Sequence, residues 1–367
     1  MIALTETGKL TMFKPKVSLV FPCWHAAKHM QHVLEDLQAQ TFKDFEAILV
    51  NDGDNSQVEA MEAIAAQDSR IRIVRLEQNG GLANARNVGT DATTANWVTY
   101  PDPDDRFGPN YIANLYEAVD GTGVEMACGG YTEVKARTGK CFPKFIDISN
   151  SCKVMDISTV YDLVFGTSIM NVAWNKLYNK EVMRKYALCH NNDHPFHQDV
   201  SFNCLYYHHI NRVGLVRDCN YYYYIYGEGT NCRRYHNNLM QVRYEIIGLK
   251  EELHRYIGWS EQKVTEIRTY ELACLCLYIL ENVSYKDSPL NTREATAKIQ
   301  TELFDQKEFV NAILHCELVK NYRLRITRCL VRIGNARLAV LTFRTLGFCK
   351  RHFGKMYSKT KSLFRGE

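Results

Sequence analysis

Residues 97–107 read WVTYPDPDDRF, a short β-branched and aromatic run that ends in three carboxylates, Asp102, Asp104 and Asp105, with two prolines among them. Carboxylates on a stiff turn repel one another, and each pair about 4 Å apart costs about 4 kcal/mol at an effective dielectric constant of about 20. A hard divalent cation with oxygen ligands relieves that repulsion, and such ions commonly bridge phosphates. A solvated acidic turn is the alternative, so the surrounding sequence has to distinguish the two.

The sequence around this turn predicts strands that alternate with helices. Strands that alternate with helices imply right-handed crossovers and a largely parallel sheet. In such sheets the ligand binds beyond the carboxyl ends of the strands. Short apolar runs indicate strands at about 16–21, 47–50, 71–76 and 97–100, and helical patterns lie between them at about 26–37, 58–66 and 82–90.

Polar or glycine-containing segments follow all four predicted strands. They are Pro22-Cys23-Trp24-His25, Asn51-Asp52, Asn79-Gly80-Gly81 and Asp102 to Asp105. Because the carboxyl ends of parallel strands meet at one edge of a sheet, we expect these four segments on one rim. A single acidic turn is weak evidence, but four converging segments predict a binding site.

Two blocks of sequence resemble family 2 glycosyltransferases with the GT-A fold, in order and in spacing. The first block comprises KVSLVFPCWHAAKHMQHVLEDLQAQTFKDFEAILVNDGDNS, DSRIRIVRLEQNGGLANARNVGTDA and WVTYPDPDD. The second comprises AWNKLYNKEVM, HQDVSFNCLY and YYYYIYGEGT. The resemblance covers about residues 14–235. It implies an α/β fold with a Rossmann-like sheet and helices on both faces, and an inverting sugar transfer that uses Mn²⁺ or Mg²⁺.

The resemblance implies roles for residues on the donor side. Asp52 would hold the nucleotide base by accepting from a ring N–H, although an aspartate before Gly53 also suits a turn. The loop that begins at Pro22 would line the base pocket. This chain has Cys23-Trp24-His25 where the family usually has a Val-Tyr-Asn type segment, which makes Trp24 a candidate stacking surface. His25 is either a helix entry or a ligand contact.

Phosphate and metal contacts are implied farther along the chain. Asn79-Gly80 precedes a helix, and a helix N-terminus favours anions. Arg86 would reach a phosphate or the acidic turn, or else form a structural Arg–Asp pair. The family's Asp-x-Asp pattern implies that Asp104 binds the metal and that Asp102 contacts ribose or metal, with Asp105 in support.

The second block carries the implied catalytic base and acceptor contacts. Asp199 would take the proton of the acceptor hydroxyl, and a helix N-cap is its alternative role. Gln198 stands where the family usually has a glutamate. Trp174, with Asn175 and Lys176, matches the acceptor-side motif, and its ring would stack on a sugar or lie in the core. Arg233 or Arg234 would contact the diphosphate.

The end of the chain is basic and partly apolar. From Leu318 to Glu367 there are 13 Lys and Arg residues and one acid. Basic amphipathic helices suit an anionic membrane surface, whereas a solvated basic face packed on the domain is the alternative. Nucleic-acid binding is not expected, because no recognition module occurs.

The family resemblance, together with the length of the chain, implies the expected organisation. We expect a catalytic domain at 14–235, with a nucleotide-sugar half (14–130) and an acceptor half (131–235), then a helical extension (236–317) and a membrane-docking tail (318–367). No apolar run of 18 residues occurs, so a membrane-spanning helix is not expected. The 13 cysteines include no CxxC pair, and the first residues do not have the pattern of a secretory signal. We therefore expect a cytoplasmic enzyme on the inner face of the cell membrane.

Two other functions compete with a glycosyltransferase. A sugar nucleotidyltransferase would have a Gly-rich, Lys-bearing loop after the first strand, and the segment at Pro22 is not such a loop. A membrane-docked binding protein with a decayed site is disfavoured by the intact Asp52, Asp102, Asp104 and Asp199. The favoured function is sugar transfer from a nucleotide-sugar, with UDP as the favoured nucleotide, to a glycan or lipid-linked acceptor in synthesis of a surface polysaccharide or lipopolysaccharide.

Overall fold

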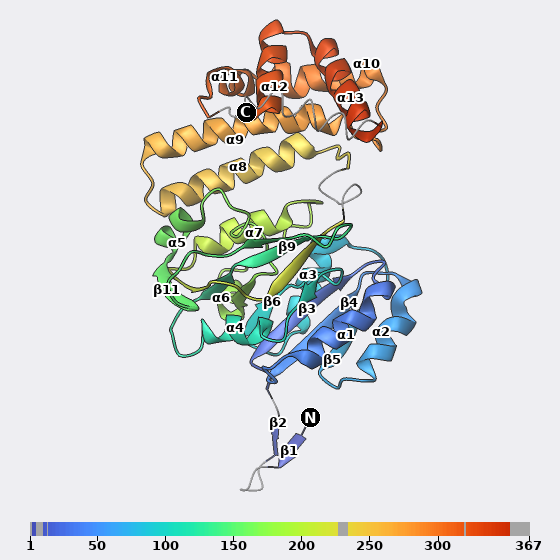
Figure 1. Cartoon of the computed structure of the whole chain (residues 1–367), viewed down its shortest axis with the longest axis vertical. Coiled ribbons are helices and arrows are strands. Elements are labelled where there is room, and N and C mark those ends of the chain that lie inside the picture. Colours follow the sequence, from blue (N-terminus) through green and yellow to red (C-terminus); the bar gives the residue numbers. More distant parts are fainter. Residues whose placement is uncertain (1, 5–9, 13, 227–233, 319–320, 353–367) are drawn as a thin grey trace. The chain divides into compact units, whose positions relative to one another are not determined.

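An eight-stranded mixed sheet forms the centre of the first half of the chain (Figure 1). The computed structural model describes residues 2–4, 10–12, 14–226, 234–318 and 321–352. The chain divides into two compact units, residues 1–226 and 227–367. The strands of the central sheet, in order, are β11 (Cys152–Asp156), β13 (Arg212–Val216), β8 (Met126–Gly129), β12 (Lys176–Asn179), β6 (Trp97–Thr99), β3 (Val17–Cys23), β4 (Phe45–Asn51) and β5 (Ile71–Arg75).

The four predicted strands all form, and they run parallel to one another. β3 pairs with β4 and β6, and β4 pairs with β5. Every residue of β3 and β4 is buried, as expected for parallel strands with both faces covered. Pro22 lies inside β3 instead of ending it. The pairing of β3 with β6 stops at Leu19, so the missing N–H of Pro22 lies beyond that ladder.

A glycine lets one helix approach the sheet closely. Gly89 lies in α3, and a Cβ there would come within 2.3 Å of a Val20 methyl and 2.9 Å of a Val50 methyl. Burial of this helix face fixes the position of α3 over the carboxyl halves of β3 and β4. The helices of the first unit are α1 (Met30–Ala39), α2 (Val58–Ala65), α3 (Gly81–Ala92), α4 (Tyr111–Glu117), α5 (Ile157–Val164), α6 (Lys180–Lys185) and α7 (Gln198–Tyr207).

A second, four-stranded sheet contains the tyrosine run. Its strands, in order, are β10 (Cys141–Lys144), β9 (Tyr131–Lys135), β14 (Tyr221–Ile225) and β7 (Arg106–Phe107). β7 directly follows the acidic turn and pairs antiparallel with β14, so the tyrosines lie beside the turn. A separate hairpin pairs β1 (Ile2–Leu4) with β2 (Leu10–Met12).

The second unit is helical in its described part. Its helices are α8 (Leu239–Tyr256), α9 (Glu261–Asn282), α10 (Thr292–Ile299), α11 (Lys307–His315), α12 (Tyr322–Ile333) and α13 (Ala336–His352), with a π-helical turn at Gln300–Phe304. The apolar stripes expected on α8 and α9 are buried at Val242, Ile246, Leu272 and Leu280.

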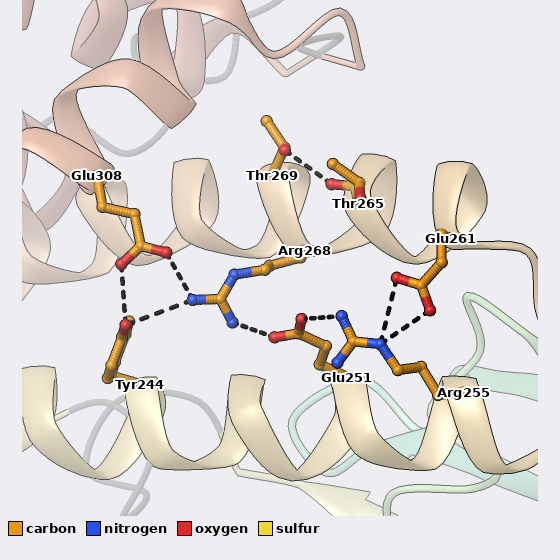
Figure 2. Close-up of polar contacts among 8 residues, drawn as sticks. All are labelled: Tyr244, Glu251, Arg255, Glu261, Thr265, Arg268, Thr269 and Glu308. Carbon is orange, nitrogen blue, oxygen red and sulfur yellow. Dashed lines mark hydrogen bonds and ion pairs between the residues drawn. The ribbon is translucent and has the colours of Figure 1, made fainter.

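An ion-pair network joins three of these helices (Figure 2). Arg268 of α9 donates to Glu251 of α8 and, at 2.5 Å, to Glu308 of α11. Tyr244 donates to the other oxygen of Glu308 at 2.9 Å, and Arg255 donates to Glu251 at 2.7 Å. Because both glutamates are shared, the network fixes the relative positions of α8, α9 and α11.

The two helices of the predicted tail belong to this second unit. Ala339, Val340 and Phe343 of α13 are buried, as are Leu330 and Val331 of α12. The apolar residues of the tail therefore divide into a set that forms the core of the unit and a set that faces solvent. Within the described residues, no helix combines the length and the apolar character needed to cross a membrane.

Candidate active site

Asp52 follows β4 and joins it to the start of α3. Its Oδ1 accepts from the N–H of Gly80 at 2.7 Å, and its Oδ2 accepts from the N–H of Gly81 at 3.0 Å. Desolvation raises the pKa of this carboxyl, and the two backbone N–H groups oppose the rise. The anion at this helix N-terminus is thus Asp52 itself. Each carboxylate oxygen keeps one lone pair for a ligand.

Two loops of the rim pack against each other at a glycine. Gly53 has φ +73°, and a Cβ there would come within 2.4 Å of the backbone nitrogen of Asn79. Any other residue would be strained and would push the two loops apart. Gly53 therefore sets the distance between Asp52 and the segment that begins at Asn79.

The loop after β3 presents two exposed aromatic rings, those of Trp24 and His25. Trp24 is exposed, and its ring lies 4.4 Å from that of His25. His25 has φ +53°, and both its backbone N–H and its Nδ1 lie within 3.1 Å of Oδ2 of Asp54. These bonds hold His25 at the helix entry, and its side chain stays 69% exposed. Trp24 likewise keeps the exposure that a stacking surface requires.

Arg86 lies between two carboxylates that come from different elements. Its side chain is 1% exposed, and Nη2 donates to Oδ1 of Asp102 at 3.3 Å. Nη1 lies 3.8 Å from Oδ2 of Asp199. Desolvation lowers the pKa of Arg86, but the charges of Asp199 and Asp102 help to raise it above the ordinary arginine value. The guanidinium therefore stays charged. The Arg–Asp pair foreseen from the sequence is present, and it extends to the predicted base.

The acidic turn is held by the tyrosine strand. Asp105 is buried, and its two oxygens accept from the Tyr224 N–H at 2.7 Å and the Tyr221 hydroxyl at 2.8 Å. The Tyr221 hydroxyl also accepts from the N–H of Asp102 at 3.0 Å. Desolvation, together with Asp102 and Asp104, raises the pKa of Asp105 well above its usual range. Asp105 therefore supports the turn from inside, as predicted.

Asp102 and Asp104 remain as candidate ligands for a metal ion. The pKa of Asp102 is raised to about 7, because desolvation and the charges of Asp104 and Asp199 together outweigh the opposing charge of Arg86. Among the described residues, no three His, Cys, Asp or Glu side chains are placed to hold an ion by themselves. Two crowded carboxylates fit a divalent ion that takes its other ligands from a diphosphate and water.

Asp199 lies in the first turn of α7 and faces Arg86. The N-cap of α7 is His197, with φ +57°, so Asp199 is not the capping residue. Its side chain is 23% exposed, which leaves the carboxylate accessible to an acceptor hydroxyl. Asp199 and the acidic turn therefore approach the same guanidinium, that of Arg86.

Trp174 does not form an acceptor surface, which corrects its predicted contact with a sugar. The side chain is 2% exposed. Its ring stacks on Tyr221 with centroids 4.4 Å apart and meets the edge of Tyr131 at 4.5 Å. The core interpretation therefore holds, and Trp174 supports the tyrosine strand behind the acidic turn.

Asn175 and Lys176 are also buried, and their polar groups are bonded inside the protein. Asn175 donates to the carbonyls of Gly129 at 2.7 Å and Ile169 at 3.1 Å. The Lys176 ammonium donates to the carbonyls of Ile169 and Val172 and to Oδ1 of Asn175, all within 2.8 Å. Burial lowers the pKa of Lys176. These bonds correct the predicted acceptor contact, because they order the loop at 169–172 instead.

One buried histidine of the site escaped sequence reasoning. His190 stacks on Phe202, with centroids 4.2 Å apart, and meets Tyr100 edge-on at 5.0 Å. Neither of its ring nitrogens has a hydrogen-bond partner among the described residues. Desolvation and the neighbouring Arg86 lower its pKa well below the usual range. His190 is therefore a buried, neutral ring beside Arg86.

An asparagine joins the loop before α7 to α3. The side chain of Asn87 donates to the carbonyl of His190 at 2.9 Å and accepts from the N–H of His190 at 2.8 Å. Asn87 follows Arg86 in sequence, so this pairing holds the approach to Asp199 beside the guanidinium. The adjacency of Asn87 to Arg86 was the available signal for this contact. Arg233, the predicted diphosphate contact, lies outside the described residues.

Residues 18–186 match the family described as Glycosyl transferase family 2. This part of the chain belongs to glycosyltransferase family 2. This match contains Asp52, Arg86, Asp102 and Asp104, whereas Asp199 follows it. The predicted enzyme class and the α/β GT-A fold are confirmed.

Curated relatives carry glycosyltransferase names. The chain is 26% identical over 264 residues to "Uncharacterized glycosyltransferase EpsJ" of Bacillus subtilis (strain 168), which is 71% of this chain and 72% of that protein. It is 34% identical over 117 residues to "Glycosyltransferase GlyG" of Streptococcus pneumoniae serotype 4, which is 31% of this chain and 38% of that protein. A match to the teichoic acid poly(glycerol phosphate) polymerase of Staphylococcus epidermidis, 24% identical over 216 residues, covers 58% of this chain and 28% of that protein.

Solved structures confirm the fold of this family 2 glycosyltransferase. The structure of S. aureus TarS 1–349 in complex with UDP-GlcNAc superposes with a TM-score of 0.57 and 15% sequence identity, covering 92% of each chain. The same protein in complex with UDP gives a TM-score of 0.56 and 16% identity, with 92% of each chain covered.

Proposed function

We propose that the protein transfers a sugar, with inversion, from a UDP-sugar to a hydroxyl group of a glycan or lipid-linked acceptor in cell-surface polysaccharide synthesis. The observation that carries the proposal is the position of Arg86 between Asp102 and Asp199. One buried guanidinium brings the acidic turn and the candidate base into one site. Inverting transfer needs such a pair of regions, because the acceptor attacks opposite the leaving group.

The donor would lie along the carboxyl ends of β3, β4 and β6. Asp52 keeps a lone pair on each carboxylate oxygen for a base N–H, and the exposed Trp24 offers a stacking surface. The structures of TarS with UDP and UDP-GlcNAc support a uridine donor for the same fold. The name of the Staphylococcus epidermidis relative supports an acceptor of the cell surface.

Chemistry at the reacting carbon would depend on two carboxylate regions. Asp199 would accept the proton from the acceptor hydroxyl as that oxygen attacks the anomeric carbon. Arg86 would orient Asp199, because its guanidinium lies 3.8 Å from the carboxylate and is itself buried. Asp102 and Asp104 would hold Mn²⁺ or Mg²⁺, which neutralises charge on the leaving diphosphate when it is bound.

The first prediction tests the donor site with a metal chelator. Release of UDP from a panel of UDP-sugars should stop in excess chelator and return with Mn²⁺ or Mg²⁺. Asp104→Asn should lower the metal-supported rate by about 100-fold or more, since charge neutralisation contributes several kcal/mol to the transition state. Asp147→Asn, at an exposed aspartate, is the matched control.

The possible outcomes test the metal assignment and the class of reaction independently. Full activity in chelator would remove the metal assignment and leave sugar transfer standing. Absence of UDP binding and turnover with every UDP-sugar, in a folded protein, would contradict the proposed donor. Inversion is checked by the anomeric coupling of the freshly formed product in proton NMR.

A further inference from the structure

The outer face of α13 carries large apolar side chains that the helical unit leaves exposed. Leu338, Leu341 and Phe348 are 41%, 45% and 50% exposed. At 100° per residue they lie within an arc of about 80° on one side of the helix. Ala339 and Phe343 occupy the opposite side and are buried in the core of the unit. The exposed arc is thus a surface of a packed helix.

The charged residues of α12 and α13 are all cationic. No Asp or Glu occurs between Glu317 and Glu367, a span with 13 Lys and Arg residues. Arg337 lies on the exposed side of α13, and Arg325 and Arg332 lie on the exposed side of α12. Among the described residues, none of these three side chains has an acidic partner. Apolar and cationic groups are therefore exposed together, which a surface facing only water does not require.

A shallow groove of about 530 Å³ adjoins the arc at Phe348. Its lining includes Lys286 and Arg344, whose guanidinium donates to the Leu290 carbonyl at 2.6 Å. The hydroxyl of Ser288 also lines it and, within the described residues, is buried without a hydrogen-bond partner. Donors that lie beside an apolar ring suit a phosphate group above a hydrocarbon layer.

We propose that this surface, the α13 face with Leu338, Leu341 and Phe348 and the adjoining groove, docks on an anionic phospholipid bilayer. The three apolar side chains enter the boundary between headgroups and acyl chains. Arg337 and Lys286 contact lipid phosphates, and each basic residue near such a surface changes partitioning about fivefold. Acidic lipid is favoured over a neutral partner because α12 and α13, which form most of this surface, carry exposed cations and no Asp or Glu.

The test measures partitioning of the full chain onto vesicles by sedimentation. Vesicles of equal parts phosphatidylglycerol and phosphatidylcholine are compared with phosphatidylcholine alone. The wild type should bind the anionic vesicles, and added salt should weaken binding. Leu338→Ser/Leu341→Ser/Phe348→Ser should lower the partition coefficient about tenfold or more, and Arg337→Gln about fivefold.

Matched variants elsewhere on the surface serve as controls. Leu163→Ser/Phe165→Ser changes two exposed apolar residues of the first unit, and Arg137→Gln changes an exposed arginine. Both controls should bind anionic vesicles like the wild type. Circular dichroism and thermal unfolding establish that every variant is folded.

Three outcomes would overturn the proposal. Equal binding to neutral and anionic vesicles would remove the charge argument. An unchanged partition coefficient in the folded triple variant would place docking elsewhere. The third outcome is that the wild type does not bind vesicles but self-associates in sedimentation velocity, whereas the triple variant is monomeric. In that case the surface binds a second copy of this chain. None of these results bears on sugar transfer by the first unit.

Discussion

At the scale of single residues, the site depends on which charges share a neighbour. Arg86 lies next to Asp102 and Asp199, and the buried His190 lies next to Arg86 without adding charge. Asp105 faces away, toward Tyr221 and the backbone of β14. One carboxylate of the cluster is therefore structural, and the others remain for chemistry.

The proposed base gives the second prediction. Asp199→Asn keeps size and hydrogen bonding but cannot accept a proton, and loss of a general base costs about 10²- to 10⁴-fold. The kcat for transfer should fall by that factor, while UDP-sugar affinity measured by calorimetry stays near the wild-type value. Asp193→Asn, at an exposed aspartate of the preceding loop, should leave both quantities unchanged. More than about a third of wild-type kcat in Asp199→Asn would exclude this role.

His190 gives the third prediction, a pH dependence of stability. Burial lowers the pKa of His190 in the folded state, so below the ordinary histidine value of about 6.5 the unfolded chain binds a proton that the folded chain does not. Stability supplied by the neutral ring is thus complete above about pH 6.5 and falls on acidification by up to about 1.4 kcal/mol per pH unit.

The measurement compares urea unfolding of three proteins between about pH 5 and pH 7. His190→Leu removes the titrating group and should flatten the slope relative to the wild type. His315→Gln, at an exposed histidine, should retain the wild-type slope. Equal slopes for His190→Leu and the wild type would show that His190 does not titrate differently on unfolding.

At the scale of elements, two helical glycines differ in what surrounds them. Gly89 of α3 faces Val20 and Val50 of the sheet. Gly248 lies within α8, and a Cβ there would meet nothing within 4 Å. The same substitution should therefore have opposite effects in the two units.

This contrast is the fourth prediction. Gly248→Ala should raise the unfolding free energy of the helical unit by up to about 1 kcal/mol, as helix propensity alone requires. Gly89→Ala should lower that of the first unit by about 1–3 kcal/mol, because the added methyl overlaps packed core atoms. Urea midpoints of the two units provide the comparison. Stabilisation by Gly89→Ala would mean that α3 moves away from the sheet at little cost.

The elements themselves were largely predictable from local pattern. Apolar runs identified β3 and β4 because parallel strands buried on both faces read as continuous hydrophobic stretches. The shorter runs of β5 and β6 were also recognised, although these strands are only partly buried. The position of Asp52 followed from that topology. The bonds of Asp52 to Gly80 and Gly81 did not, since they depend on how closely two loops approach at Gly53.

At the scale of the whole chain, long-range packing decided what the sequence left open. Trp174 and the tyrosines of β14 lie far apart in sequence, so no local pattern shows that they stack. From the sequence alone, Lys176 is expected to be a surface cation. In the structure it is buried, and its ammonium donates to the carbonyls of Ile169 and Val172. The sequence of the tail predicted helices. Only the tertiary structure shows that Phe343 is buried and Phe348 is exposed.

The pairing of Asn87 with the backbone of His190 limits how freely this enzyme's parts can be exchanged. The Asn87 amide bonds both the carbonyl and the N–H of His190, as the backbone at the edge of a strand would do. It thereby holds the loop at 188–197 against α3. A loop grafted here from a relative would need a backbone that presents its N–H and carbonyl to the same amide. Libraries of this loop should therefore keep Asn87 and the backbone conformation at position 190 fixed, while the remaining loop positions are varied.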